Sequence, residues 1–105
     1  MKQLWEILVP CVRNNGNPIR TRCHRVWDAK VREITGGLTI LPPTKGQWVA
    51  PNGELFAERM IPVRIVANES EIDEIADMTA AFYEQLAVMF YRVSDDVRIK
   101  HYDAV

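Results

Sequence analysis

The chain has 105 residues, of which 48% are hydrophobic and 26% are charged, and its formal net charge at pH 7 is −1. These values are typical of a small globular protein, so we expect residues 1–105 to form a single domain. A net charge this small argues against a general nucleic-acid-binding protein, and no apolar run approaches the roughly 18 residues of a membrane-spanning helix. The two cysteines, Cys11 and Cys23, fit neither a disulfide framework nor a metal-binding pattern, so we expect buried free thiols, no metal and no cofactor.

Alternating apolar residues predict a first strand over Leu4–Val12. Glu6 interrupts this run, which is also too short for a signal peptide, so we expect a cytoplasmic location. In the loop that follows, Asn17 is suited to cap a helix and Pro18 to occupy the first helical position. We therefore expect a helix over Pro18–Ile34, ended by the glycine pair that follows it.

A β-hairpin with a long second arm is the clearest element of the sequence. A short strand is expected over Leu38–Leu41, and the alternation over 46–51 leads through an Asn52-Gly53 turn into a central strand over Leu55–Val66. Because Pro62 has no amide proton, one edge of this strand is expected to lack a partner there. We also expect a bulge at this proline, since a charged residue shortly before it breaks the apolar series that faces the core.

Asn68 or Ser70 is predicted to cap a second helix that ends near Gln85–Ala87. Two further strands are expected over Val88–Val93 and Val97–Tyr102. If the two strands before the Asn-Gly turn are one bent strand, the order becomes β-α-β-β-α-β with an extra C-terminal strand. This order predicts an α+β fold of the ferredoxin-like type, in which two helices cover one face of an antiparallel sheet and the other face is free to pair with a second copy.

Three short motifs in the middle of the chain are shared with a family of small proteins. The motifs are Gly37-Leu38-Thr39-Ile40, Gly46-Gln47-Trp48 and Asn52-Gly53-Glu54, followed by the long aliphatic strand. This pattern, GLT(I/V)…GQW…NGE, resembles a family of small bacterial proteins whose function is unknown. The similarity covers about Trp27 to Ile99. The resemblance implies a ferredoxin-like fold and no particular activity.

Residues of the long strand and of the end of the second helix are candidates for ligand binding. A strand places Glu58 and Arg59 on opposite faces, so one of them is expected to face covered surface, where an unpaired charge is costly. An ion pair within the fold would satisfy that charge, and the alternative is a contact with a ligand or a second subunit. Trp48, Tyr83 and Gln85 are expected beside this strand, where they line a pocket or belong to the core.

The loop before the first helix is a candidate anion site. Arg13, Asn17 and Arg20 lie near the expected start of the helix, where free amide groups and the helix dipole favour negative charge. His24 and His101 are the only histidines, and His24 is expected on the solvent side of its helix. No Ser-His-Asp, HExxH or Walker pattern is present, so the sequence assigns no catalytic residue.

The predicted second face of the sheet favours self-association. Phe56, Met60, Leu8 and Phe90 make this face partly apolar, and a monomer would expose it. We therefore expect a small homo-oligomeric domain that binds an unknown ligand, without a role at membranes or on nucleic acids. One alternative is a small cofactor-free enzyme of the monooxygenase, isomerase or lyase type, with its site at the sheet–helix or subunit boundary. Another is an accessory protein that binds a partner through its oppositely charged helices.

Overall fold

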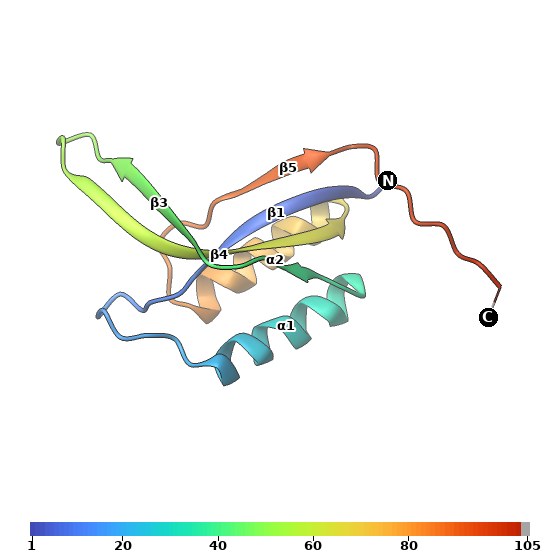
Figure 1. Cartoon of the computed structure of the whole chain (residues 1–105), viewed down its shortest axis with the longest axis horizontal. Helices are drawn as coiled ribbons and strands as arrows, with labels where there is room; N and C mark the ends of the chain where they lie inside the picture. Colours follow the sequence, from blue (N-terminus) through green and yellow to red (C-terminus); the bar gives the residue numbers. More distant parts are fainter. Residues whose placement is uncertain (104–105) are drawn as a thin grey trace.

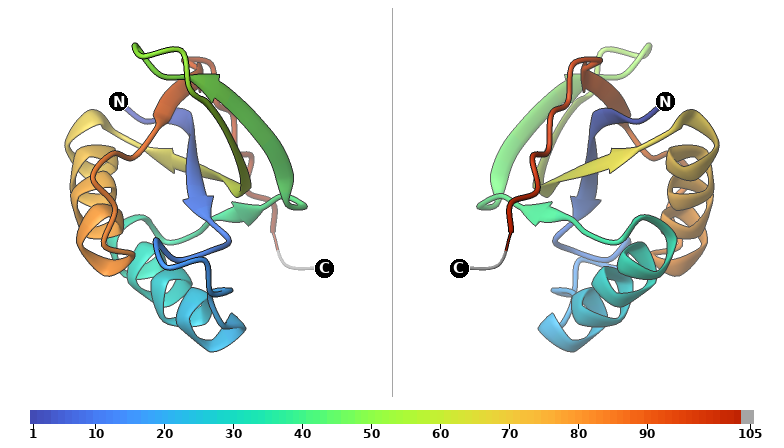
Figure 2. Two further views of the ribbon diagram at one scale, coloured as in Figure 1. Left: turned by 90° about the vertical axis from the view of Figure 1, so that its left-hand side faces the viewer. Right: turned by 90° about the vertical axis from the view of Figure 1, so that its right-hand side faces the viewer.

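The structure is a computed structural model that describes residues 1–103. It shows an α+β fold in which a five-stranded antiparallel sheet carries two helices on one of its faces (Figures 1 and 2). The elements are β1 (Gln3–Pro10), α1 (Thr21–Thr35), β2 (Thr39–Ile40), β3 (Thr44–Val49), β4 (Leu55–Ala67), α2 (Glu69–Phe82) and β5 (Phe90–Ser94). The predicted fold class is confirmed.

β4 is the longest strand and the centre of the sheet. The strand order is β2-β4-β1-β5, and β3 pairs with β4 further along the same edge that β2 uses. β2 and β3 therefore behave as one strand interrupted by Pro42-Pro43, as the sequence predicts. With that pair counted once, the connectivity is ferredoxin-like.

Pro62 faces the interruption between β2 and β3. No ladder pair lies opposite it on that edge, because β2 ends at Ile40 and β3 begins at Thr44, so the predicted interruption of the ladder is confirmed. The edge is not without a partner, since the Pro62 carbonyl accepts a hydrogen bond of 2.9 Å from the amide of Leu41. The predicted bulge is wrong, because the register between β1 and β4 runs without a shift from Met60 to Ala67. Because the neighbouring edge is interrupted opposite Pro62, no strand there requires an amide proton from it. The proline is therefore accommodated without a bulge.

The hydrophobic core lies between the sheet and the two helices. From α1 it receives Trp27 and Val31, and from α2 it receives Ile72 and Ile75, residues that are three or four positions apart within their helices. Alternate residues of β1 and β4 point toward these helices and are buried: Trp5, Ile7, Val9, Val63, Ile65 and Ala67. Full burial of one such aliphatic side chain stabilises the fold by about 1.5–3 kcal/mol.

Helix α1 begins at Thr21, so the prediction that it starts at Pro18 with an Asn17 cap is wrong. The preceding loop folds back on itself instead. The amide of Arg13 donates to the Asn17 carbonyl at 2.8 Å, the amide of Ile19 donates to the Cys11 carbonyl at 2.9 Å, and Val12 and Pro18 form a β-bridge. These pairings hold residues 18–20 in an extended conformation, and local helix signals cannot overcome them.

Helix α2 has the predicted Asn68 cap but ends earlier than expected. Asn68 and Glu71 form a reciprocal capping box, in which each side chain accepts a hydrogen bond from the other residue's amide. At the other end, Glu84 has a φ of 55°, and the amides of Glu84 and Gln85 donate to the carbonyls of Ala81 and Ala80. This pattern is a Schellman motif, which ends the helix at Phe82 rather than near Gln85–Ala87.

The C-terminal segment differs from the prediction. β5 covers Phe90–Ser94 rather than Val88–Val93, and Phe90 lies opposite Ile7 on the helix-covered side, not on the open face. The extra strand predicted over Val97–Tyr102 is not formed, because this segment has no ladder partner within residues 1–103. Figure 1 shows it running away from the end of β5 as an extended tail.

The first half of β4 and its partner β3 form a hairpin that extends past the helices (Figure 1). β1 pairs with β4 only from Met60 onward, and the amide of Cys11 still donates to the Arg59 carbonyl at 3.3 Å, so residues 55–58 have a neighbour on one edge alone. The molecule is elongated, with extents of 54 × 29 × 23 Å, and the hairpin and the C-terminal tail lie at the two ends of its long axis (Figure 1). We call residues 44–59 the projecting hairpin.

Candidate functional site

An open cleft of about 340 Å³ lies at the foot of the projecting hairpin. Three of the predicted ligand-binding residues line it, namely Glu58, Arg59 and Gln85. The remaining lining residues come from the end of β1, the loop after it and β4: Pro10, Val12, Arg13, Asn14, Ala57 and Met60. We call this the hairpin cleft.

Glu58 and Arg59 are both exposed, so the expectation that one of them faces covered surface is wrong. The pair lies in the half of β4 that extends past the helices, where both faces of the ribbon meet solvent. Neither side chain forms an ion pair within residues 1–103. The hairpin cleft therefore offers a free carboxylate and a free guanidinium group to a ligand, whereas the guanidinium group of Arg13 lies against Cys23.

Gln85 is held at the hairpin cleft by the turn that ends α2. Its Nε2 donates to the carbonyl of Tyr83 at 3.2 Å and to Oδ1 of Asn14 at 3.4 Å. Asn14 in turn donates from Nδ2 to the Glu84 carbonyl at 2.8 Å. The β1–α1 loop and the end of α2 are thus joined by side-chain amides. Asn14 carries no sequence signal for this role, because the contact depends on residues 70 positions apart.

Trp48 lies away from the hairpin cleft. It sits opposite Phe56 on the projecting hairpin, and the two rings stack with centroids 4.6 Å apart. Half of its surface remains exposed. This cross-strand pair stabilises the ribbon locally and leaves an aromatic surface in solvent.

Tyr83 is buried between the helices and does not line a cleft. Its hydroxyl lies 2.6 Å from Nδ1 of His24, and its ring lies against Trp27. The prediction that His24 faces solvent is therefore wrong, since the packing of α1 on α2 brings it to Tyr83. Burial raises the pKa of the Tyr83 hydroxyl and lowers the pKa of His24, so both groups are neutral near pH 7 and a hydrogen bond between neutral partners joins them.

Side chains fill the volume between sheet and helices in which the enzymatic alternative places its site. Trp27 and Tyr83 are each 1% exposed, and the indole of Trp27 donates from Nε1 to Oγ1 of Thr79 at 2.9 Å. Thr79 itself donates to the Ile75 carbonyl at 2.6 Å. The polar atoms in this layer satisfy one another, which is typical of a packed core with a structural role.

The three predicted anion-binding residues meet in a second open cleft. Arg13, Asn17 and Arg20 line it together with Asn15, Pro18, Arg22 and Cys23. Nη2 of Arg13 lies 3.6 Å from Sγ of Cys23, and no acidic residue is part of the lining. We call this the arginine cleft. Arg22 was missed at the sequence level because the helix was expected to start earlier.

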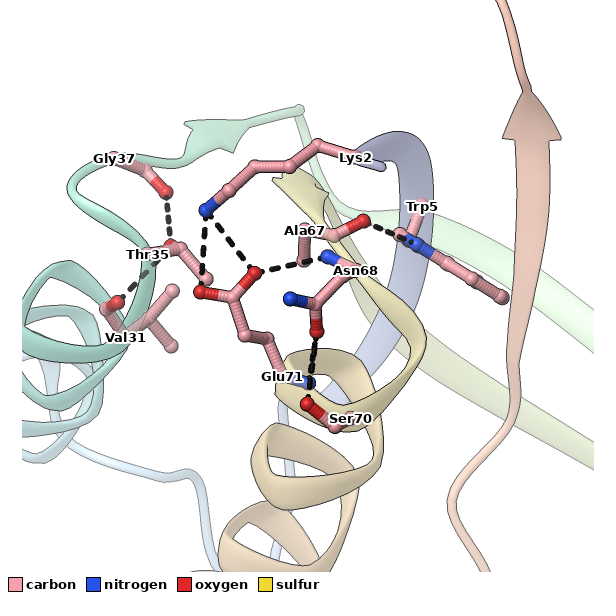
Figure 3. A network of polar contacts seen from close by, with 9 residues as sticks. All are labelled: Lys2, Trp5, Val31, Thr35, Gly37, Ala67, Asn68, Ser70 and Glu71. Atoms are coloured by element: carbon pink, nitrogen blue, oxygen red, sulfur yellow. Dashed lines mark hydrogen bonds and ion pairs between the residues drawn. The ribbon is translucent and has the colours of Figure 1, made fainter.

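Two polar networks elsewhere have their groups satisfied within the chain. On the open face, the Glu6 carboxylate accepts from Nε of Arg64 at 3.0 Å and from the Tyr91 hydroxyl. At the start of α2, Nζ of Lys2 forms an ion pair with Glu71 at 3.1 Å, beside the Asn68 capping box (Figure 3). The backbone amide of Asn68 and the Lys2 ammonium lower the pKa of Glu71. These contacts stabilise strand and helix ends.

The part of the chain that the structure describes contains no group of three His, Cys, Asp or Glu side chains that could hold a metal ion. Both cysteines are free and half-buried. Among residues 1–103 no helix is long and apolar enough to cross a membrane.

Comparison with solved structures identifies several proteins with the same fold. A divalent cation tolerance protein (Cut A1) from Thermus thermophilus superimposes with a TM-score of 0.69 and 11% identity, covering 93% of this chain and 88% of that chain. A periplasmic divalent cation tolerance protein CutA from Archaeoglobus fulgidus gives 0.69 and 13%, covering 95% and 89%. CutA1 from Oryza sativa gives 0.68 and 11%, covering 93% and 83%.

These similarities establish the fold and nothing finer, because the sequence identities are low. No protein-family model and no curated protein matches the sequence. The resemblance based on the GLTI…GQW…NGE motifs is therefore not confirmed as a family assignment. One neighbour is described as periplasmic, so the predicted cytoplasmic location stays a prediction. What the comparisons show is that this chain folds like the CutA proteins.

Proposed function

We propose that this protein is a small self-associating domain that acts by binding, and that copies associate through the projecting hairpin. One observation carries the proposal: the hairpin exposes large apolar side chains on both strands. Trp48 is 50% exposed, Val49 is 64% exposed and Leu55 is 60% exposed. Exposed apolar side chains that lie together in this way are typical of a surface that binds another protein.

The backbone of the hairpin supports the same proposal. Residues 55–58 pair with β3 alone, and a two-stranded ribbon is at best marginally stable in water. Its free strand edges are templates for pairing with another chain. A second copy that covers the ribbon would bury the apolar side chains and satisfy the edges together.

Sedimentation velocity at micromolar concentration tests this proposal. We expect a mass that is a multiple of the 12.1 kDa of one chain, and we expect Trp48→Lys to shift it toward one chain. Val26→Lys is the matched control, because Val26 on α1 is 49% exposed but lies far from the hairpin in sequence and fold. A wild-type protein that sediments as a single chain contradicts the proposal.

The ligand of this binding domain is not specified by its fold. The names of the structural neighbours connect those proteins with tolerance of divalent cations. A binding function of that broad kind is consistent with our proposal. The enzymatic alternative has less support, because Trp27 and Tyr83 fill the volume between sheet and helices that it requires.

A further inference from the structure

The arginine cleft is preorganised by the backbone of the β1–α1 loop. The amide of Arg13 donates to the Asn17 carbonyl at 2.8 Å, and the amide of Gly16 donates to the Arg13 carbonyl at 2.9 Å. The Val12–Pro18 bridge closes the base of the loop. Arg13 and the residues at the start of α1 therefore face one another from fixed backbone positions.

Three arginines line this cleft, and no acidic residue does. These are Arg13, Arg20 and Arg22, at three separate backbone positions. None of the ion pairs within residues 1–103 involves them. By contrast, Arg64 on the sheet pairs with Glu6. Arg13 is half-buried, so part of its hydration is lost with only the Cys23 sulfur in contact.

The charge at the start of α1 is also unfavourable for the helix itself. Cations near a helix N-terminus oppose the macrodipole, yet α1 has Arg20 at its N-cap position, Arg22 in its first turn and no acidic residue there. α2 follows the favourable rule, with an Asn68 cap and acidic residues in its first turn. Charges that break a local stability rule without compensation are typical of functional sites.

We infer that the arginine cleft binds a phosphate group. Guanidinium groups donate paired hydrogen bonds to phosphate oxygens, and a dianion offers acceptors in several directions, which suits arginines from two segments, Arg13 in the loop and Arg20 and Arg22 at the start of α1. The helix end would not define a site alone. The arginines and the cleft define it, and the free amides of the first turn add to it. This inference is independent of the proposed self-association.

An NMR titration of the full chain with inorganic phosphate tests the inference, with chloride adjusted to keep ionic strength constant. We expect saturable amide shifts centred on Asn17–Cys23. Arg22→Gln should weaken phosphate binding about tenfold, the loss of one charge-assisted hydrogen bond. Arg25→Gln is the control, because Arg25 is exposed on the same helix but does not line the cleft.

Two further arms sharpen the result. Glycerol 3-phosphate distinguishes a phosphate ester from free phosphate: tighter binding of the ester assigns a phosphorylated small molecule, and equal binding assigns the phosphate ion. Citrate at the same ionic strength should bind less tightly than phosphate. Shifts that rise linearly without saturation, an equal loss in Arg22→Gln and Arg25→Gln, or citrate binding as tight as phosphate would each overturn the inference.

A thermal melt gives a second readout. Without phosphate, Arg22→Gln should melt at or above the wild-type temperature, because it removes an unfavourable charge from the helix N-terminus. With phosphate, the wild type should gain more in melting temperature than the variant. A variant that melts lower in both buffers, with the same gain from phosphate, contradicts the inference.

Discussion

The two halves of β4 have the same alternation but opposite environments. Val63, Ile65 and Ala67 point toward the helices and are buried, whereas Leu55 and Ala57, which alternation places on the same face, are exposed. The helices cover only the second half of the strand. Alternation therefore indicates which residues share a face, but what covers that face is decided by the length and position of the helices.

The largest expected effect is a difference in the free energy of unfolding between substitutions in the two halves of β4. Ile65→Ala should lower the free energy of unfolding by about 2–5 kcal/mol, because it removes a fully buried side chain. Leu55→Ala in a dilute, unassociated sample should change it by less than about 0.5 kcal/mol. Urea unfolding at low and high protein concentration measures both. A large loss for Leu55→Ala in the monomer would break the distinction.

The contact between His24 and Tyr83 predicts a pH dependence of the helical layer. Burial lowers the pKa of His24 in the folded protein below its ordinary value of 6.5. Between these two pKa values, the unfolded chain therefore binds more protons than the folded protein. Stability should therefore fall as the pH is lowered from about 6.5 through the folded pKa. His24→Gln should flatten this part of the profile in urea unfolding at pH 7.5, 6.5 and 5.5.

The opposing group in that experiment is Asp28. Burial raises the pKa of the Asp28 carboxyl above its ordinary value, so at lower pH the folded protein binds more protons at this residue than the unfolded chain does. The contribution of Asp28 to stability therefore rises as the pH is lowered. Asp28→Asn removes this opposing contribution, and because the Asp28 carboxylate raises the pKa of His24, the loss of stability in this variant should continue to a lower pH than in the wild type. A wild-type profile that is flat between pH 7.5 and 5.5 would show that His24 is not held neutral by the fold.

The smaller effect concerns the end of α2, next to the hairpin cleft. Glu84 has a φ of 55°, a conformation that glycine adopts without the steric cost that a Cβ brings. Glu84→Gly should stabilise the protein by roughly 0.5–1 kcal/mol. Glu74→Gly, at an exposed position inside the same helix, should destabilise it by about 1 kcal/mol. Thermal unfolding compares them, and equal losses would contradict the assigned Schellman motif.

Local signals predicted the elements whose partners are near in sequence. The hairpin, the split before β3 and the Asn68 cap follow from short-range chemistry, and the structure contains them all. The expected two-residue turn at Asn52-Gly53 is wrong, because only Gly53 of the pair has a positive φ and its amide donates to the Ala50 carbonyl in a longer loop. The Pro18 signal failed because the Val12–Pro18 bridge competes with the helix. The strand expected over Val97–Tyr102 failed because alternation does not supply a ladder partner.

The candidate sites were predictable to a smaller extent. Sequence reasoning selected Glu58, Arg59 and Gln85, and the structure places them around one cleft. It could not separate Tyr83 from them, because burial by Trp27 and the contact with His24 depend on how α1 packs on α2. Asn14 was missed for the same reason. Contacts between distant segments need the fold before they can be assigned.

Hydrogen–deuterium exchange at two protein concentrations tests most directly whether the projecting hairpin is the surface of association. The central claim predicts that amides in residues 44–49 and 55–59 exchange more slowly as concentration rises, while the buried amides of β1 keep their rates. Trp48→Lys should remove the concentration dependence. Hairpin amides that exchange at the same rate at both concentrations, in a wild-type protein that is fully folded, would contradict it.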